Sequence, residues 1–204
     1  MTHNSLSMLR NLALIFFLSG FSALIYQTAW QRVLFTNIGV DLTSITVIIS
    51  VFMAGLGVGA FFGGRIADQY PKHVLIAFCI FEMGIGLFGL ISIHTIHTIQ
   101  DFFSNSGILA TSAIYFTLLL FPTFLMGATL PLLTAFFNRY FRNIGQSIGI
   151  LYFFNTLGAA IGALTTGYFL FGELGILVTT YVAAVINIFI SILIFALYGK
   201  KTNE

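Results

Sequence analysis

The chain has 204 residues, of which 58% are hydrophobic and only 7% are charged, and its formal net charge is +2. Soluble globular domains carry about 25% charged residues, so this composition excludes a water-facing surface over most of the molecule. The small and scattered net charge also argues against a nucleic-acid partner. We therefore expect a membrane protein whose main partner is the lipid bilayer.

Six apolar segments follow one another along the chain, each long enough for a membrane-spanning helix of about 20 residues. Helices are expected because backbone groups within lipid must be hydrogen-bonded inside their own segment. The sequence therefore predicts an all-α fold, a polytopic membrane protein with six transmembrane helices in a single transmembrane domain of residues 1–204. The predicted spans are Leu12–Phe35, Leu42–Gly64, His73–Thr95, Ile108–Phe137, Ile148–Phe171 and Leu174–Tyr198.

The first predicted helix follows Arg10, an arrangement that also begins a signal peptide. Its apolar run continues to about Phe35, which is longer than the apolar core of about 7–15 residues in signal peptides. We interpret it as a retained helix. Trp30 near its outer end reads as an interfacial anchor or as a packing residue.

Glycines at four-residue spacing mark the second and fifth helices. Gly55, Gly59 and Gly63 share one face of the second helix, and Gly158 and Gly162 share one face of the fifth. Small residues at this spacing allow close helix packing in lipid. The two helices hold corresponding places in the two halves of the chain, so a 3+3 inverted repeat is one interpretation. Two ladders that arose independently are the other.

Charged residues lie at the ends of several predicted helices. Arg65, Asp68 and Lys72 follow the second helix and could form a gating charge lock or belong to a static turn. Arg32 lies near the outer end of the first helix. We expect it to form a structural clamp with Glu173, or with Asp41.

Two prolines, Pro122 and Pro131, interrupt the fourth helix. Each removes a backbone donor and favours a bend. The bend could be a hinge, as in a transporter, or a static kink whose freed carbonyls bond to neighbours such as Thr129.

Polar side chains at membrane depth are costly, so each is a candidate for function. At a rise of about 1.5 Å per helical residue, Glu82 lies near the middle of the third helix. The sharper interpretation is a ligand-binding site for a cation or amine, with Glu82 as counter-charge or proton carrier. The other is that Gln27 or Asn155 hydrogen-bonds to Glu82, which then only holds the packed helices together. The full candidate set is Glu82, Asn155, Gln27, Tyr26 and Asn187.

The distribution of Lys and Arg predicts the orientation. Seven of the eight fall on one side if the helices alternate, and only Arg32 falls on the other. Basic residues gather on the cytoplasmic side. We therefore expect a multi-pass protein of the cell inner membrane with both termini cytoplasmic.

The sequence shows no motif for a catalytic site or a cofactor. It contains no P-loop lysine motif and no G-x-S-x-G elbow, and the glycine pairs at Gly55–Gly59 lie inside an apolar span. His94, His97 and Asp101 have a spacing that would suit a metal, but isolated interfacial histidines are commoner. We expect no enzyme activity, no cofactor and no metal site in this chain.

Residues Gly64–Lys72 read GRIADQYPK. This segment resembles the loop motif G-x-L-A-D-R-x-G-R of the major facilitator superfamily and departs from it at Gln69 and Pro71. An ordered set of further motifs covers nearly the whole chain: Ser19–Gln27, Trp30, Arg32, Phe52–Leu56, Gly59, Gly64–Asp68, Glu82, Gly84, Gly86, Pro122, Met126–Leu132, Tyr152, Asn155–Ala159 and Gly162. In this order they resemble the membrane domain of spermidine synthase-like membrane proteins.

That resemblance implies a half-facilitator-like helical bundle. In the family, such a bundle is joined to an aminopropyltransferase domain of methyltransferase-like fold, which binds decarboxylated S-adenosylmethionine and an amine acceptor. This sequence ends at Glu204, a few residues after the sixth predicted helix. The resemblance therefore covers the membrane domain and leaves no basis here for catalysis.

Two functions remain open at this point. The chain could transport or bind a small solute, a polyamine or another cation, and a homodimer would then supply the usual facilitator complement of helices. Alternatively, it is a non-transporting scaffold that anchors a separate aminopropyltransferase-like or other partner at the cytoplasmic face. That partner would meet the basic residues Arg139, Arg142, Lys200 and Lys201.

Overall fold

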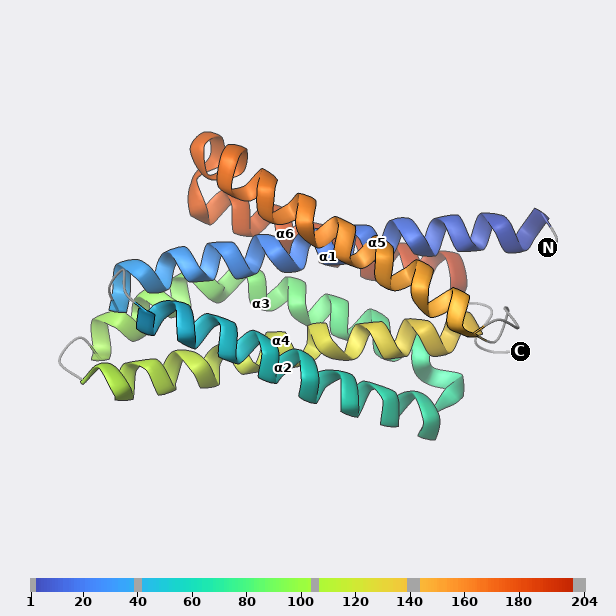
Figure 1. Ribbon diagram of the computed structural model, residues 1–204, viewed down its shortest axis with the longest axis horizontal. Coiled ribbons are helices and arrows are strands. Elements are labelled where there is room, and N and C mark those ends of the chain that lie inside the picture. Colours follow the sequence, from blue (N-terminus) through green and yellow to red (C-terminus); the bar gives the residue numbers. More distant parts are fainter. Residues whose placement is uncertain (1–2, 39–41, 104–106, 139–143, 200–204) are drawn as a thin grey trace.

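A computed structural model describes residues 3–38, 42–103, 107–138 and 144–199. Figure 1 shows a bundle of long helices, and the described residues contain no β-strand. The fold class is thus all-α, as predicted. The elements are α1 (His3–Ile38), α2 (Leu42–Gln69), the short 3-10 helix η1 (Pro71–His73), α3 (Val74–Phe103), α4 (Ile108–Asn138), α5 (Ile144–Thr165), the π-helical turn η2 (Thr166–Leu170) and α6 (Phe171–Tyr198).

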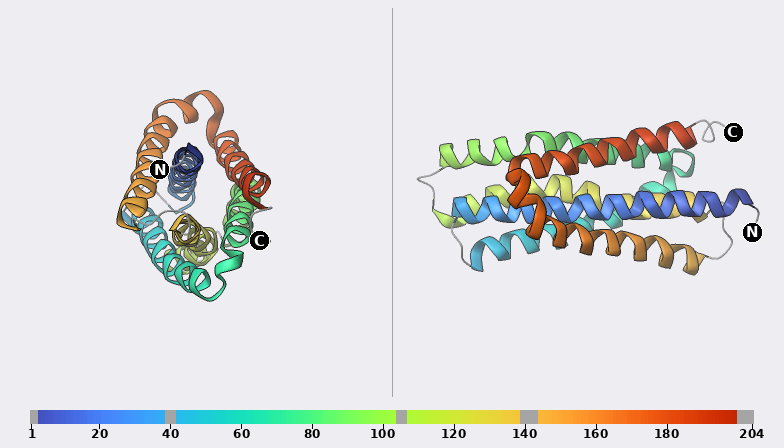
Figure 2. Two further views of the ribbon diagram at one scale, coloured as in Figure 1. Left: turned by 90° about the vertical axis from the view of Figure 1, so that its right-hand side faces the viewer. Right: turned by 90° about the horizontal axis from the view of Figure 1, so that it is seen from above.

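The number of membrane spans differs from the prediction. Five segments of the described chain are long and apolar enough to cross a membrane, and the last runs for 51 residues from Ile148 to Tyr198. It joins α5, η2 and α6, so six separate spans are not confirmed. The chain still reverses inside this segment (Figure 2). The helical backbone is broken at Gly175, whose φ is 73° and whose ψ is 171°. The predicted spans place this break at Gly172–Glu173.

Most helices are longer than the apolar runs that predicted them. The second ends at Gln69 rather than Gly64, and the third ends at Phe103 rather than Thr95. Hydropathy marks the part of a helix that suits lipid, whereas hydrogen bonding continues the helix into polar sequence. The start of α1 and the end of α6 lie at one end of the bundle (Figure 1). This fits termini on one side of the membrane, and which side it is stays a prediction.

The helices form an inner pair and an outer ring. Figure 2 shows α1 and α4 inside, surrounded by α2, α3, α6 and α5. The most extensive contacts join α2 to α4, α1 to α5 and α3 to α6. If α1, α2 and α3 are exchanged with α4, α5 and α6 in that order, the same three helix pairs are in contact. A three-plus-three repeat requires this symmetry. The repeat itself stays a prediction.

Both glycine ladders lie at these contacts. A Cβ atom on Gly59 would meet the backbone of Phe124 in α4, and one on Gly63 would meet Ala128. On α5, the corresponding neighbours of Gly158 and Gly162 are the backbones of Phe17 and Phe21 in α1. The structure therefore uses the two ladders to bring an outer helix against each inner helix, because only glycine permits such close approach. Gly55 likewise lies against Thr123 of α4.

The α4 helix carries both prolines and continues through them without interruption. Thr129 donates a hydrogen bond to the Met126 carbonyl at 2.7 Å. The carbonyl that Pro131 deprives of its helical donor is that of Gly127, so Thr129 does not compensate for this proline. A hinge at Pro122 or Pro131 stays a prediction.

The buried core is divided into two apolar clusters. One lies toward the chain ends and includes Phe16, Phe78 and Ile194. The other lies toward the distal end, the end opposite the start of α1 and the end of α6, and includes Tyr26, Trp30 and Ile85. Between them, in sequence order on each helix, come polar residues that belong to neither cluster: Ser19 on α1, Glu82 on α3, Thr129 on α4 and Asn187 on α6.

Candidate functional site

Glu82 is the acidic residue of this polar layer and has no solvent exposure. Its two carboxyl oxygens accept hydrogen bonds from different helices. Ser19 Oγ of α1 donates to one at 2.8 Å, and Asn187 Nδ2 of α6 donates to the other at 2.6 Å. Glu82 lies on the buried face of α3, three residues after Cys79 and three before Ile85, so the helical repeat directs it inward. The group joins three helices at one point.

A cavity of about 370 Å³ adjoins this group. Ser19 and Asn187 line it, whereas Glu82 lies behind them and does not. The amide oxygen of Asn187 is buried and has no hydrogen-bond partner. An unpaired acceptor in a buried site is costly unless a ligand or a water supplies the donor. The other lining residues are Gly20, Ala23, Leu24, Gln27, Phe52, Met53, Leu56, Ile85, Met126, Thr129, Tyr152, Asn155 and Thr156.

Four of the five predicted binding residues meet at or directly behind this cavity. Gln27, Asn155 and Asn187 line it, and Glu82 supports two of its lining residues. Asn155 donates from Nδ2 to the Phe16 carbonyl at 3.4 Å. Neither Gln27 nor Asn155 satisfies Glu82, contrary to one of our interpretations. The partners are Ser19 and Asn187.

Tyr26 is not part of the cavity lining. Its ring is fully buried, stacks on Trp30 with centroids 5.0 Å apart and lies against Gly89. Its hydroxyl is a second buried group without a hydrogen-bond partner. Trp30 itself is fully buried and donates to Ser92 Oγ at 3.0 Å. Trp30 is therefore a packing residue and not an interfacial anchor.

Sequence reasoning missed the role of Ser19, Thr129, Tyr152 and Thr156. Ser19 has a weak signal, because Ser19, Ala23 and Gln27 follow one another at four-residue spacing and share a helical face. A serine is too common in membrane helices for this spacing to single it out.

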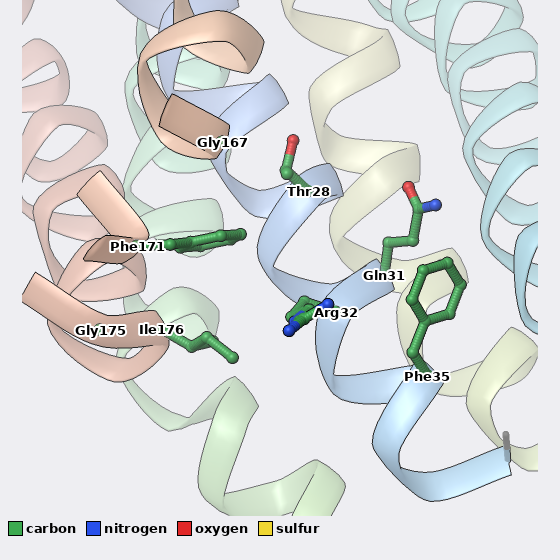
Figure 3. Close-up of a pocket in the computed structure, with 8 residues that line it drawn as sticks. All are labelled: Thr28, Gln31, Arg32, Phe35, Gly167, Phe171, Gly175 and Ile176. Atoms are coloured by element: carbon green, nitrogen blue, oxygen red, sulfur yellow. The ribbon is translucent and has the colours of Figure 1, made fainter. Parts of the chain in front are cut away.

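A second hollow, of about 690 Å³, lies near the distal end beside Arg32 (Figure 3). Thr28, Gln31, Arg32 and Phe35 of α1 line one side. Gly167, Phe171, Gly175 and Ile176 line the other. The predicted clamp between Arg32 and Glu173 is not formed, because among the described residues no ion pair joins them. Asp41, the alternative partner, lies outside the described residues.

The predicted charge lock after α2 is also not formed in this structure. The Arg65 guanidinium lies 4.7 Å from the centre of the Phe61 ring, one turn earlier on the same helix. Arg65, Asp68 and Lys72 are all exposed, and within the described chain no ion pair joins them. Exposed ion pairs gain little free energy, so a nearby aromatic ring competes well for the guanidinium.

His94 is near the distal end and its Nε2 lies 3.3 Å from the Tyr181 hydroxyl. Nowhere in the described ranges do three His, Cys, Asp or Glu side chains gather as metal ligands would. The basic residues Arg139, Arg142, Lys200 and Lys201, which were assigned to a partner protein, fall outside these ranges.

The sequence profile of the Major Facilitator Superfamily matches residues 12–204. The chain belongs to this superfamily. Membership indicates a transporter-like membrane bundle and confirms the resemblance to this superfamily. No solved structure matches this member of the Major Facilitator Superfamily.

The chain is also similar to a polyamine aminopropyltransferase of Oceanobacillus iheyensis. The two are 24% identical over 160 residues, which are 78% of this chain and 30% of the relative. This match confirms the resemblance to spermidine synthase-like proteins at the level of a membrane domain. The chain covers less than a third of its relative, so the activity in that name belongs to the relative.

Proposed function

We propose that this chain binds a small solute with hydrogen-bond donors and carries it across the membrane, and that the cavity beside Glu82 is its binding site. The observation that carries the proposal is the contact between Glu82 and two residues of the cavity wall, Ser19 and Asn187. Membership of the Major Facilitator Superfamily supports transport in general.

The size and lining of the cavity support a small solute. Ligand sites range from about 300 to 1,000 Å³, and this cavity holds about 370 Å³. Its wall is mostly apolar, with amide and hydroxyl groups from Gln27, Asn155 and Thr156 among the lining residues. Such a site suits a slender molecule with a few polar groups.

The acceptors at this end of the cavity favour a donor such as a protonated amine. The buried amide oxygen of Asn187 lacks a partner and would become an acceptor for the solute if this side chain turned toward the cavity, and the Glu82 carboxyl group behind it supplies a counter-charge. Reorientation of Asn187 or Ser19 would open Glu82 to the solute. The relative's name concerns polyamines, so a di- or polyamine is the first solute to test.

The test is uptake of labelled spermidine into proteoliposomes by the wild-type chain and by Glu82→Gln. The substitution keeps the shape of the side chain and removes its charge, so we expect uptake to fall about tenfold or more, the effect of losing one charge-assisted contact. Glu173→Gln, which neutralises an exposed carboxylate outside the cavity, is the matched control and should transport normally. Wild-type binding and flux in folded Glu82→Gln would refute the assignment of the site.

The second candidate is a scaffold for a separate aminopropyltransferase-like partner at the cytoplasmic face. Its support is the similarity to a much longer protein with that activity in its name. Purification from native membranes should then yield a complex containing a soluble synthase-like chain. Recovery of this chain alone under mild detergent conditions would count against the scaffold.

A further inference from the structure

The hollow beside Arg32 exists because the connection between α5 and α6 stops short of the distal end of α1 (Figure 2). Part of its wall has no side chains. A Cβ atom added to Gly167 or to Gly175 would meet nothing within 4 Å. The hollow is therefore open, and Figure 3 shows Arg32 on α1, with Phe171 and Ile176 to one side of it and Gln31 and Phe35 of its own helix to the other.

Arg32 brings to this hollow a positive charge that nothing in the described chain neutralises. An arginine stays protonated in proteins, and Arg32 is exposed with no ion pair among the described residues. The acidic residues that the structure describes toward this end are Asp101 and Glu173, and neither lines the hollow. A guanidinium inside or at the edge of a membrane is normally paired or solvated.

We propose that this hollow binds a phosphate group, with Arg32 as its main ligand. The planar guanidinium offers two parallel N–H donors that match phosphate oxygens. The side-chain amide of Gln31, which lines the same hollow, is a second donor, whereas the Thr28 hydroxyl already donates to the Leu24 carbonyl at 2.7 Å. Phe35, Phe171 and Ile176 supply apolar contacts for the remainder of the molecule.

Two sources of phosphate share this chemistry, a phospholipid headgroup and a soluble phosphate ester. The exposed apolar residues near the hollow favour a lipid. Tyr168 and Phe169 of η2 and Leu174 of α6 are 79%, 66% and 42% exposed, and such a surface suits acyl chains. The site is separate from the solute cavity and does not depend on the proposed transport.

The experiment measures binding to the full chain in detergent, by native mass spectrometry for phosphatidylglycerol and phosphatidylcholine, and by thermal stabilisation for inorganic phosphate. The variants are Arg32→Gln, Arg32→Lys and the control Arg10→Gln. Arg10 is an exposed arginine at the other end of the same helix. The unfolding curve of each variant, followed by Trp30 fluorescence, verifies that it is folded.

We expect phosphatidylglycerol to bind the wild type and Arg10→Gln, and to bind Arg32→Gln about tenfold to a hundredfold more weakly, the range for one charge-assisted contact. Arg32→Lys keeps the charge without the planar fork, so its loss should be intermediate. Stabilisation by inorganic phosphate that depends on Arg32, without retention of phosphatidylglycerol, would support the site and favour a soluble phosphate compound over a lipid. Equal retention of phosphatidylglycerol by folded wild type and Arg32→Gln, or an equal loss in Arg10→Gln, would overturn the proposal.

Discussion

Asn187 Nδ2 donates a 2.6 Å hydrogen bond to the fully buried carboxyl group of Glu82, so α6 and α3 are joined at the middle of the bundle by a polar contact. The same carboxyl group accepts from Ser19 of α1. One side chain thus links an inner helix to two helices of the outer ring. A shift of these helices relative to one another would strain these hydrogen bonds unless the side chains reorient.

Asn187→Leu should lower the free energy of unfolding by about 1–3 kcal/mol, because a buried oxygen of Glu82 then loses its donor. Denaturant unfolding in detergent measures the change. Ser191→Ala is the control. Ser191 donates to the Cys79 carbonyl at 2.7 Å across the same helix pair, but that carbonyl is a helical backbone acceptor, so the loss should be smaller, about 1 kcal/mol.

A double variant separates this polar contact from simple packing. If Glu82→Met is combined with Asn187→Leu, both partners are apolar, and only the Ser19 hydroxyl, which lines the cavity, loses its acceptor. The double variant should therefore recover most of the stability that Asn187→Leu loses. Losses that simply add up would show that the two side chains are not energetically coupled.

Gly59→Ala should destabilise the bundle by about 1–3 kcal/mol, because the added Cβ meets the Phe124 backbone and forces α2 away from α4. Gly57→Ala is a matched control on the same helix. A Cβ atom there meets nothing within 4 Å, and alanine is the better helix former by about 1 kcal/mol. Thermal unfolding of the two variants should move in opposite directions. Equal shifts would contradict the packing assigned to the ladder.

Gly175→Ala should destabilise by about 1–3 kcal/mol although there is room for its side chain, because its backbone region is open almost only to glycine. Its φ of 73° and ψ of 171° place it there. Gly172→Ala, three residues earlier, also has no atom within 4 Å of the added Cβ and has no positive φ. Thermal unfolding should therefore be nearly unchanged in Gly172→Ala, and a comparable loss in both would refute the backbone explanation.

The fluorescence of the chain reports on one site, since Trp30 is the only tryptophan. Trp30 is fully buried between aromatic rings and donates to Ser92. Its emission in the folded protein should lie at short wavelength and resist quenching by acrylamide. Unfolding should shift it to long wavelength and expose it to the quencher. Strong quenching in the folded state would place Trp30 at the surface.

The sequence is sufficient to predict the helices, because an apolar segment of this length has no other way to satisfy its backbone in lipid. It also predicts part of the candidate cavity, namely three of its polar lining residues and the Glu82 behind them. Glu82, Asn187, Asn155 and Gln27 are conspicuous because polar residues are rare at membrane depth. The glycines that bring α2 to α4 and α5 to α1 are visible for a similar reason, since their four-residue spacing defines a face.

The tertiary structure alone decided which of these residues meet. Ser19, and not Gln27 or Asn155, joins Asn187 at Glu82, because helix rotation and crossing set the partners and neither is encoded in spacing along one helix. Arg32 lies in an open hollow and not in a clamp with Glu173, since the chain reverses at Gly175 short of the distal end. Hydropathy determines that a segment enters the membrane, whereas packing between helices determines what each polar side chain faces.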